Sequence, residues 1–362
     1  MKKIIFVTVA SLAALTFSGC VGCASCNSKT KNTALTSSNW YAGTSYKGIQ
    51  PSHIIDDGYT SEKIVYTVTH SGGSNNTYSV EYKDGTFTTE FYATYYNWNS
   101  SNIPEEFRVD EKELVYCYTT SLNISVRFKK GDNTTEWFED SISTLAYFRA
   151  AGKNLQPVYS RQDILSNTPA LYQASSLDKT YELVDVVYEN FYTHSFTDVK
   201  SITYKDGETT EKTYGRLAKQ KNSLFDNSTL YIAARSLNLS TNLSQSINLF
   251  SAASGGISTY NISGSDTRLS DIEQATAESL LQAKGLYIPE GDNPALSTVA
   301  LDLSFASGEL KGTTQTVWYA AITNSDNNLA RATMLKIASP LSYGLGTLTY
   351  NLKSIESTLW ND

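Results

Sequence analysis

The sequence predicts a mainly β (α+β) fold: a curved antiparallel sheet, half-barrel or barrel-like in shape, with one or two packed helices. Three observations predict it. From about residue 40 onward, short runs rich in Val, Ile, Thr, Tyr and Phe alternate with Gly, Asn and Asp, as in strands joined by tight turns. Windows with the 3.6-residue period of a helix are few. The 25 tyrosines fall largely in strand-like runs, which tyrosine favours.

The first strands are read from alternation and turn residues. Residues 64–70 alternate with period two, and segments 77–82 and 86–96 flank Lys83-Asp84-Gly85. Asp-Gly between alternating segments favours a type I′ turn, because both central residues need positive φ. A hairpin is therefore predicted at this point. Further strands are predicted at 113–120, 123–130, 181–192, 199–204, 209–217, 298–305, 314–322, 330–337 and 346–355.

One helix is well signalled, at 270–285. Ser270 and Glu273 have the spacing of a capping box, and Lys284-Gly285 supplies a cation and a glycine cap at the other end. A shorter helix is predicted at 229–237. The apolar positions of the first helix are Ile272, Ala275, Leu280 and Leu281.

The N-terminus has the pattern of an export signal. Lys2 and Lys3 precede an apolar stretch at 4–17, which is too short for a reliable bilayer span. The stretch ends in Phe17-Ser18-Gly19-Cys20, which resembles the lipobox of bacterial lipoproteins, although Phe17 replaces the usual aliphatic residue. The resemblance implies removal of residues 1–19 and a diacylglycerol, with fatty acids such as palmitate, on Cys20. The alternatives are ordinary secretory cleavage nearby and Cys23 as acceptor.

Such an anchor places the protein on the extracytoplasmic side of the cell membrane or outer membrane. Two acyl chains bind a bilayer stably, whereas one is marginal. Loss of Lys2 and Lys3 changes the formal charge from −7 to −9, so anionic headgroups do not attract the mature chain. Residues 20–39 are rich in Ser, Thr, Asn and Lys and are expected to form a flexible tether.

Three cysteines, Cys20, Cys23 and Cys26, are spaced C-x-x-C-x-x-C. A zinc or iron–sulfur site needs a fourth ligand and a packed shell, and the polar tether offers neither. Incidental thiols, a Cys23–Cys26 disulfide and a second lipidation remain open. Cys117 is expected to be a small buried residue on a strand. No metal and no cofactor is predicted.

The mature chain divides into two β-rich halves, 40–170 and 171–362, with a boundary near 165–178. Segment 82–90 recurs at 204–211 with one residue deleted. The repeat indicates either two related halves of one sheet or two similar domains, and Asp-Gly hairpins also resemble one another by chance. The prediction therefore leaves open that the two halves form one domain.

The sequence offers no catalytic constellation. The excess of 36 acidic over 29 basic residues argues against a nucleic-acid partner. Three histidines and the lack of HExxH, EF-hand, Walker A, GxGxxG and GxSxG patterns disfavour metal, nucleotide and serine enzymes. Ser176-x-x-Lys179 precedes a predicted strand, and Ser325-Asp326-Asn327 has no K-T-G after it. The acidic pairs at 105–113 and 136–140 are interpreted as solvated residues of surface loops. The protein is predicted not to be an enzyme.

Aromatic residues supply the candidate ligand contacts. On a strand, Tyr92 and Tyr96 share one face while Phe91 and Tyr95 share the other, and Trp98 follows closely. Such rings suit sugar stacking or a groove, but cross-strand aromatic pairs also stabilise an ordinary sheet. The candidate contacts are Tyr92, Tyr95, Tyr96 and Trp98.

Hairpins, a long curved sheet and an amphipathic helix behind a lipobox resemble in outline the LolA-like and related envelope lipoproteins, whose half-barrels cradle acyl chains. The resemblance implies a non-enzymatic, lipid-anchored protein that binds an amphiphilic, lipid, peptide or protein ligand of the envelope. A surface glycan-binding lipoprotein is the alternative, and a secreted hydrolase with an unrecognised site is the third. An apolar cavity beside the 270–285 helix favours the first, an exposed row of rings the second, and convergent carboxylates the third.

The anchor is tested by Cys20→Ala in the full chain. Without the acylated thiol the protein should leave the membrane fraction, since no other predicted segment binds a bilayer. Fractionation and globomycin sensitivity of processing are the measurements, with Cys23→Ala as the matched control that stays membrane-bound. A Cys20→Ala protein still found at the membrane contradicts the assignment.

Overall fold

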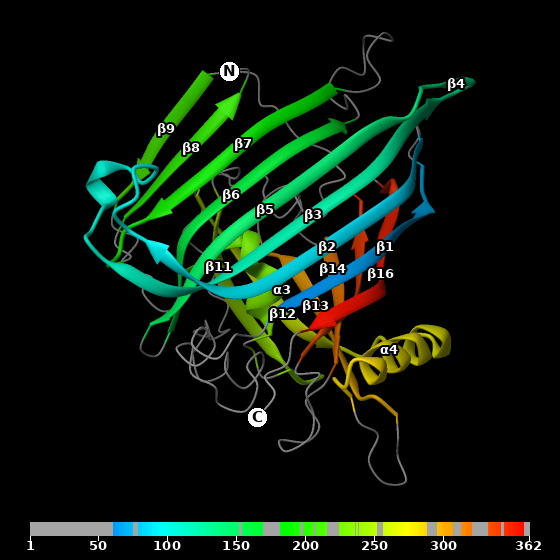
Figure 1. Ribbon diagram of the computed structural model, residues 1–362. Helices are drawn as coiled ribbons and strands as arrows, with labels where there is room; N and C mark the ends of the chain where they lie inside the picture. The colour runs from blue at the N-terminus through cyan, green and yellow to red at the C-terminus, as the bar shows by residue number, and fades with distance from the viewer. Residues whose placement is uncertain are drawn as a thin grey trace.

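The computed structural model describes a single 16-stranded sheet that is strongly curved and does not close (Figure 1). The described residues are 61–74, 79–151, 154–168, 182–195, 198–205, 208–215, 224–235, 237, 239–251, 256–287, 295–306, 313–320, 332–341 and 344–357. The predicted fold class, a curved antiparallel sheet with packed helices, is confirmed.

The strands are long in the N-terminal half and shorter in the C-terminal half. They are β1 (Glu62–Gly72), β2 (Ser79–Asn97), β3 (Lys112–Lys130), β4 (Asn133–Thr134), β5 (Phe138–Ala151), β6 (Asn154–Thr168), β7 (Glu182–Tyr192), β8 (Val199–Lys205), β9 (Glu208–Tyr214), β10 (Leu224–Asp226), β11 (Ser244–Ser251), β12 (Gly256–Ser265), β13 (Thr298–Phe305), β14 (Thr314–Ala320), β15 (Met334–Pro340) and β16 (Gly346–Ser357). The helices are α3 (Leu230–Ala234) and α4 (Asp271–Ala283), with 3₁₀ turns η2 (Glu105–Phe107) and η5 (Asn227–Thr229).

The first strand lies in the middle of the sheet. The order is β10-β11-β12-β13-β14-β15-β16-β1-β2-β3-β5-β6-β7-β8-β9, with β4 paired to β3. β1 pairs antiparallel with β2 on one edge and with β16 on the other, from Glu62↔Ser357 to Gly72↔Gly346. The two halves of the chain therefore form one continuous sheet. The short β10 pairs parallel with β11, whereas the other strand pairs are antiparallel.

The concave interior is filled with protein. Helix α3 lies behind the long strands in Figure 1, and every residue of α3 is buried. Tyr319 donates a hydrogen bond to the Tyr231 carbonyl at 3.0 Å, and the Tyr231 hydroxyl donates to Gln315 at 3.0 Å. On the inner face of the long strands, Phe148 packs against Tyr116 and Phe225, with ring centroids 5.6 Å apart in both pairs.

A buried ion pair attaches α3 to the central strand. Arg235, the C-cap of α3, donates to both carboxylate oxygens of Glu62 at 2.6 and 3.3 Å. Both side chains are almost fully buried. Because a buried charge without its partner is costly, this pair fixes where α3 sits against the sheet.

Two buried carboxylates bind neighbouring segments together. Asp226 on β10 accepts hydrogen bonds from Ser160 of β6 at 2.6 Å and from Asn190 and Tyr192 of β7. These bonds tie β10, at one end of the sheet, to the inner face of the other half. Asp140 on β5 accepts from Ser166 and from the backbone and side chain of Asn167 on β6.

The hairpin predicted at Asp84-Gly85 is wrong. β2 runs unbroken through these residues, and its register against β3 shifts between Lys83 and Thr86. Asp84 has φ 53°, so the pair forms a bulge in a 19-residue strand. A Cβ at position 85 would meet Val68 at 2.6 Å, so the strands approach too closely for any side chain here. The second Asp-Gly falls between β8 and β9, whose register starts at Lys205↔Glu208.

Other predictions differ mainly where polar residues occur inside strands. Segments 113–120 and 123–130 form one strand, β3, and strands β4, β5, β6, β10, β11 and β12 were not predicted from the sequence. Asp140, interpreted as a surface-loop acid, is buried on β5 because three donors satisfy its carboxylate. The remaining predicted strands are present with shifted ends, and Cys117 is buried as expected.

Helix α4 is confirmed with its capping box. The Ser270 hydroxyl accepts from the Glu273 amide, and Glu273 accepts from the Ser270 amide. Gly285 has φ +66°, as a C-terminal glycine cap requires. The apolar face is partly wrong, because α4 docks through Ala277 and Leu281 while Ile272 is 80% exposed.

Several predictions fall outside the described residues. These are the signal peptide, Cys20, Cys23 and Cys26, the tether, and the Ser176–Lys179 and 325–327 patterns. The described part of the chain has no helix with the length and apolar content of a bilayer-spanning segment.

Substitution Glu62→Gln should destabilise the fold strongly. It leaves the Arg235 guanidinium buried without its counter-charge, at a cost of about 3–5 kcal/mol in the free energy of unfolding. Denaturant unfolding measures this. The control is Lys63→Gln, which removes the exposed Lys63–Glu90 pair and should leave the midpoint unchanged. Equal midpoints for both variants would refute the role of the buried pair.

Asp140 should make stability fall as the pH rises. Burial raises the pKa of Asp140 from 3.8 to about 6, against the opposing effect of its hydrogen bonds. Between these values the folded state binds more protons than the unfolded state, so stability present at low pH is lost through this window. Relative to Asp140→Asn, the wild type should lose about 2–3 kcal/mol between about pH 4 and pH 7. Parallel pH profiles in chemical denaturation would contradict this.

Candidate functional site

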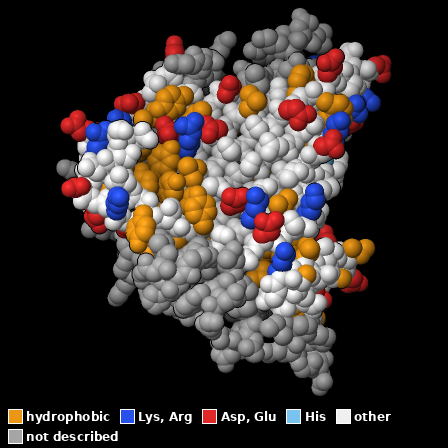
Figure 2. All heavy atoms as spheres, in the orientation of Figure 1, with side chains coloured by type: hydrophobic (Ala, Val, Ile, Leu, Met, Phe, Trp, Pro, Cys, Tyr) orange, Lys and Arg blue, Asp and Glu red, His pale blue; other side chains and the backbone are white. Residues whose placement is uncertain are grey.

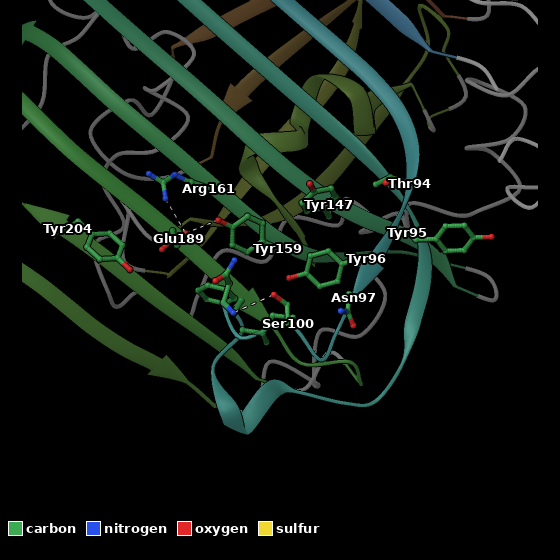
Figure 3. A pocket seen from close by; sticks show the side chains of 13 residues that line it. Thr94, Tyr95, Tyr96, Asn97, Ser100, Tyr147, Tyr159, Arg161, Glu189 and Tyr204 are labelled. Carbon is green, nitrogen blue, oxygen red and sulfur yellow. Dashed lines mark hydrogen bonds and ion pairs between the residues drawn. The ribbon is translucent and has the colours of Figure 1, made fainter. Parts of the chain in front are cut away.

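A groove of about 600 Å³ lies on the outer face of the long strands, opposite the packed interior (Figure 3). Its floor comes from β2, β5, β6, β7 and β8, and one wall from the loop between β2 and β3. Figure 2 shows hydrophobic and tyrosine side chains gathered on this side of the molecule, with Lys, Arg, Asp and Glu side chains around them. Its principal lining residues are Tyr96, Tyr147, Tyr159, Arg161, Glu189, Phe191 and Tyr204.

The floor is a row of aromatic rings that crosses the strands. Ring centroids are 5.2 Å apart between Tyr96 and Tyr147, 6.1 Å between Tyr147 and Tyr159, and 5.1 Å between Tyr159 and Phe191. The three tyrosines are partly exposed, whereas Phe191 is buried. The row therefore offers ring faces and edges to a ligand along a continuous path.

Strand register brings these rings together. Tyr147 pairs with Tyr159, and Tyr159 pairs with Phe191, so all three project from the same face of adjacent strands. The residues that follow Tyr147 and Tyr159, which are Phe148 and Ser160, face the interior and make their contacts there. The alternation of side chains along each strand therefore supplies residues to both the core and the groove.

The wall is the segment 98–111, here called the strap. Trp98 begins it and is 1% exposed, with its indole N–H donating to Glu113 of β3 at 3.0 Å. Arg149 of β5 donates to the same carboxylate oxygen at 3.1 Å, and also to the His194 carbonyl. The Trp98 ring meets His194 edge-on at 5.3 Å. These contacts fix one end of the strap to the sheet.

The middle of the strap packs over β7 and β8. Ile103 and Phe107 form a buried cluster with Phe191 and Ile202. Lys200 lies 3.1 Å from Glu106 of η2. Held at Trp98 and at its middle, the strap shields the far end of the ring row from solvent.

A charged group stands at one end of the row. Tyr159 donates to Glu189 at 2.7 Å, and an Arg161 nitrogen lies 3.4 Å from the same carboxylate oxygen. Arg161 also donates to both oxygens of Asp163, at 2.9 and 3.0 Å. Burial, followed by the hydrogen bond to Glu189, raises the pKa of Tyr159 and of Tyr204, so both phenols remain donors.

The four candidate aromatics take different positions. Tyr96 lies in the ring row, and Tyr95 lines the groove at 55% exposure while its ring points away from the row in Figure 3. Tyr92 is on the same face of β2 but further along, beside Cys117, and the hydrogen bond to Cys117 is the main factor that raises the pKa of Tyr92. Trp98, at the start of the strap, is buried and packs edge-on against the Tyr96 ring at 5.2 Å. Cys20 lies outside the described residues.

Most residues of the groove floor were not predicted from the sequence. Tyr147 and Tyr159 belong to β5 and β6, which were not predicted, and Glu189 and Phe191 were predicted only as strand residues. Tyr147 and Tyr159 were the available signal, since they flank a short connection and so face each other in a hairpin.

A second groove, of about 380 Å³, lies between α4 and strands β15 and β16. Leu269, Ile272, Ala277, Leu335 and Leu352 supply its apolar lining. Lys336 crosses its rim to Glu273 at 2.6 Å and also lies 4.9 Å from the centre of the Trp318 ring.

The first groove, here called the tyrosine groove, can recognise a ligand through its aromatic rings, its phenol hydroxyls and one carboxylate. Among its lining residues Glu189 is the one acid. Across the described residues, no group of three or more His, Cys, Asp or Glu side chains is placed to hold a metal ion. Cys117 lies in the sheet beside Tyr92 with its pKa raised to about 11 by burial, so its thiol is not activated.

Comparison with known proteins gives little. No family model matches the chain, and no curated protein matches it. Among solved structures, it is similar to a β-barrel-like protein of a domain of unknown function, DUF1849, from Brucella abortus. The TM-score is 0.43 and the identity 10%, over 83% of this chain and 98% of that one.

Loosening one end of the strap should expose it to protease. Trp98→Phe keeps the ring but removes the hydrogen bond to Glu113, at a cost of about 1 kcal/mol. Cleavage by trypsin after the exposed Arg108 should therefore be faster than in the wild type. Trp137→Phe, at the start of β5, is the control and should leave this rate unchanged. An unchanged rate in Trp98→Phe would show that the indole does not hold the strap.

Proposed function

We propose that this protein is a lipid-anchored, extracytoplasmic binding protein whose tyrosine groove takes a glycan. The observation that carries the proposal is the row of Tyr96, Tyr147 and Tyr159 rings on a sheet face that no second layer of the described structure covers. The lipobox at Cys20 supports the anchor. Among the three sequence-based hypotheses, an exposed ring row favours the glycan-binding one.

The groove matches the surface of a sugar ring. A pyranose presents C–H groups on its faces and hydroxyls around its edge, so it needs flat aromatic surface beside polar partners. Tyrosine offers both, and Glu189 accepts hydrogen bonds at the end of the row. A volume of about 600 Å³ falls within the range of small-molecule sites. A short oligosaccharide is elongated and would fit across the row of rings.

The groove supports binding better than hydrolysis. Most glycosidases use two carboxyl groups on opposite sides of the scissile bond. Glu189 is the one carboxylate among the lining residues, and nearby Asp163 is engaged by Arg161. We therefore propose a non-enzymatic role.

An amphiphilic ligand is the second candidate, and one observation favours it. The α4 groove has an apolar lining and the exposed Ile272 at its rim. The concave interior is less suitable for an acyl chain, because α3 and the surrounding tyrosines occupy it. A lipid would therefore bind beside α4 and not inside the curve of the sheet.

Neutral oligosaccharides should bind the full chain in detergent, measured by isothermal titration with chitohexaose, cellohexaose and maltohexaose. Tyr147→Ala and Tyr159→Ala should each weaken binding about two- to tenfold, since one aromatic contact is worth about 0.5–1.5 kcal/mol. Tyr147→Phe keeps the ring and should bind nearly as well as the wild type.

The matched control for these variants is Trp137→Ala, whose ring lies under Lys83 and Arg127, away from the groove. Its affinity should equal that of the wild type. Binding of none of the oligosaccharides, together with palmitate binding that Ile272→Glu abolishes, would replace the glycan proposal by the amphiphile one.

A further inference from the structure

We infer that the tyrosine groove selects against acidic glycans and binds amino sugars most tightly. This inference rests on the proposed glycan function and concerns the ligand's charge. It comes from the group at the end of the ring row, where two carboxylates, Glu189 and Asp163, face one guanidinium, Arg161.

Arg161 is not free to receive an acidic ligand. Its Nε and one terminal nitrogen bond both oxygens of Asp163, in the bidentate geometry that arginine forms with carboxylates. Its other terminal nitrogen lies 3.4 Å from Glu189. The hydrogen bonds to Asp163 are the main factor that raises the pKa of Arg161. A ligand carboxylate or sulfate would have to displace Asp163 before it could bind this side chain.

Glu189 is the charge that a ligand meets. Its side chain is 13% exposed, one of its oxygens accepts from Tyr159 and faces Arg161, and the Tyr204 phenol also hydrogen-bonds the carboxylate. A carboxylate accepts several hydrogen bonds, so capacity remains for hydroxyl or ammonium donors of a ligand. Because the site is partly desolvated, charge there acts more strongly than in water.

The other charged side chains around the groove do not reverse the negative net charge at the end of the ring row. Lys200, on the next strand, lies 3.1 Å from both Glu106 and Glu211. This lysine therefore has two acidic partners of its own. The whole chain also carries a net charge of −7, which repels polyanions at longer range.

The test compares three hexasaccharides on the full chain in detergent: glucosamine hexamer with its amines protonated, chitohexaose, and hexagalacturonate. Affinity should fall in that order, with hexagalacturonate at least about tenfold weaker than chitohexaose. Added salt should narrow the differences, because screening weakens charge interactions.

Glu189→Gln separates charge from shape. The amide keeps the size and an acceptor oxygen but lacks the negative charge, so the ratio of glucosamine-hexamer to chitohexaose affinity should fall severalfold while chitohexaose binding persists. Glu208→Gln, at the exposed start of β9, is the control and should leave this ratio unchanged. Hexagalacturonate binding as tightly as chitohexaose, or an unchanged ratio in Glu189→Gln, overturns the charge selection and leaves the glycan function standing. Binding of none of the three refutes the function itself.

Discussion

The pairing of β1 with β16 is the constraint on which the rest of the structure depends. These strands come from opposite ends of the described chain, and their register runs from Glu62↔Ser357 to Gly72↔Gly346. Without this seam the sheet would be two separate sheets, each with a new exposed edge. With it, both halves curve around the same interior, and Glu62 on β1 holds α3 there through Arg235. The seam also requires long-range closure, since nearly the whole chain must be ordered before β1 gains its second neighbour.

The filled interior explains why the functional surface lies outside. Alternation along each long strand sends one set of aromatic side chains inward, where Phe148 meets Phe225, and the next set outward, where Tyr147 meets Tyr159. The inward set has α3 and the C-terminal strands against it. Within the described residues, the outward set has only the strap against it, which is fastened by Trp98 and Arg149 and covers one end of the row. Open aromatic surface of this kind is what a ring-stacking ligand needs.

The sequence predicted the class of fold but not the site. Alternation, turn residues and the Ser270 capping box are local signals, and the strands and helix that they mark are present. Asp-Gly was ambiguous, because the same dipeptide that usually makes a hairpin also accommodates a bulge where Gly85 must lie against Val68. β5 and β6 were missed because Asp140 and Asn167, which look like loop residues, satisfy each other inside the sheet. Tyr147 and Tyr159 pair across one hairpin, but Tyr96 and Phe191 join the row from strands further away in the sequence, and no local pattern reveals their register.

The central claim is that the outer ring row, and neither the interior nor the α4 groove, is the ligand site. Hydrogen–deuterium exchange with and without saturating glucosamine hexamer tests it most directly. We expect slower amide exchange in the strap and in segments 145–161 and 187–204, with no change in α4, β15 and β16. Protection confined to α4 and its neighbouring strands, or no protection in the strap and the ring-bearing strands at saturation, would contradict it.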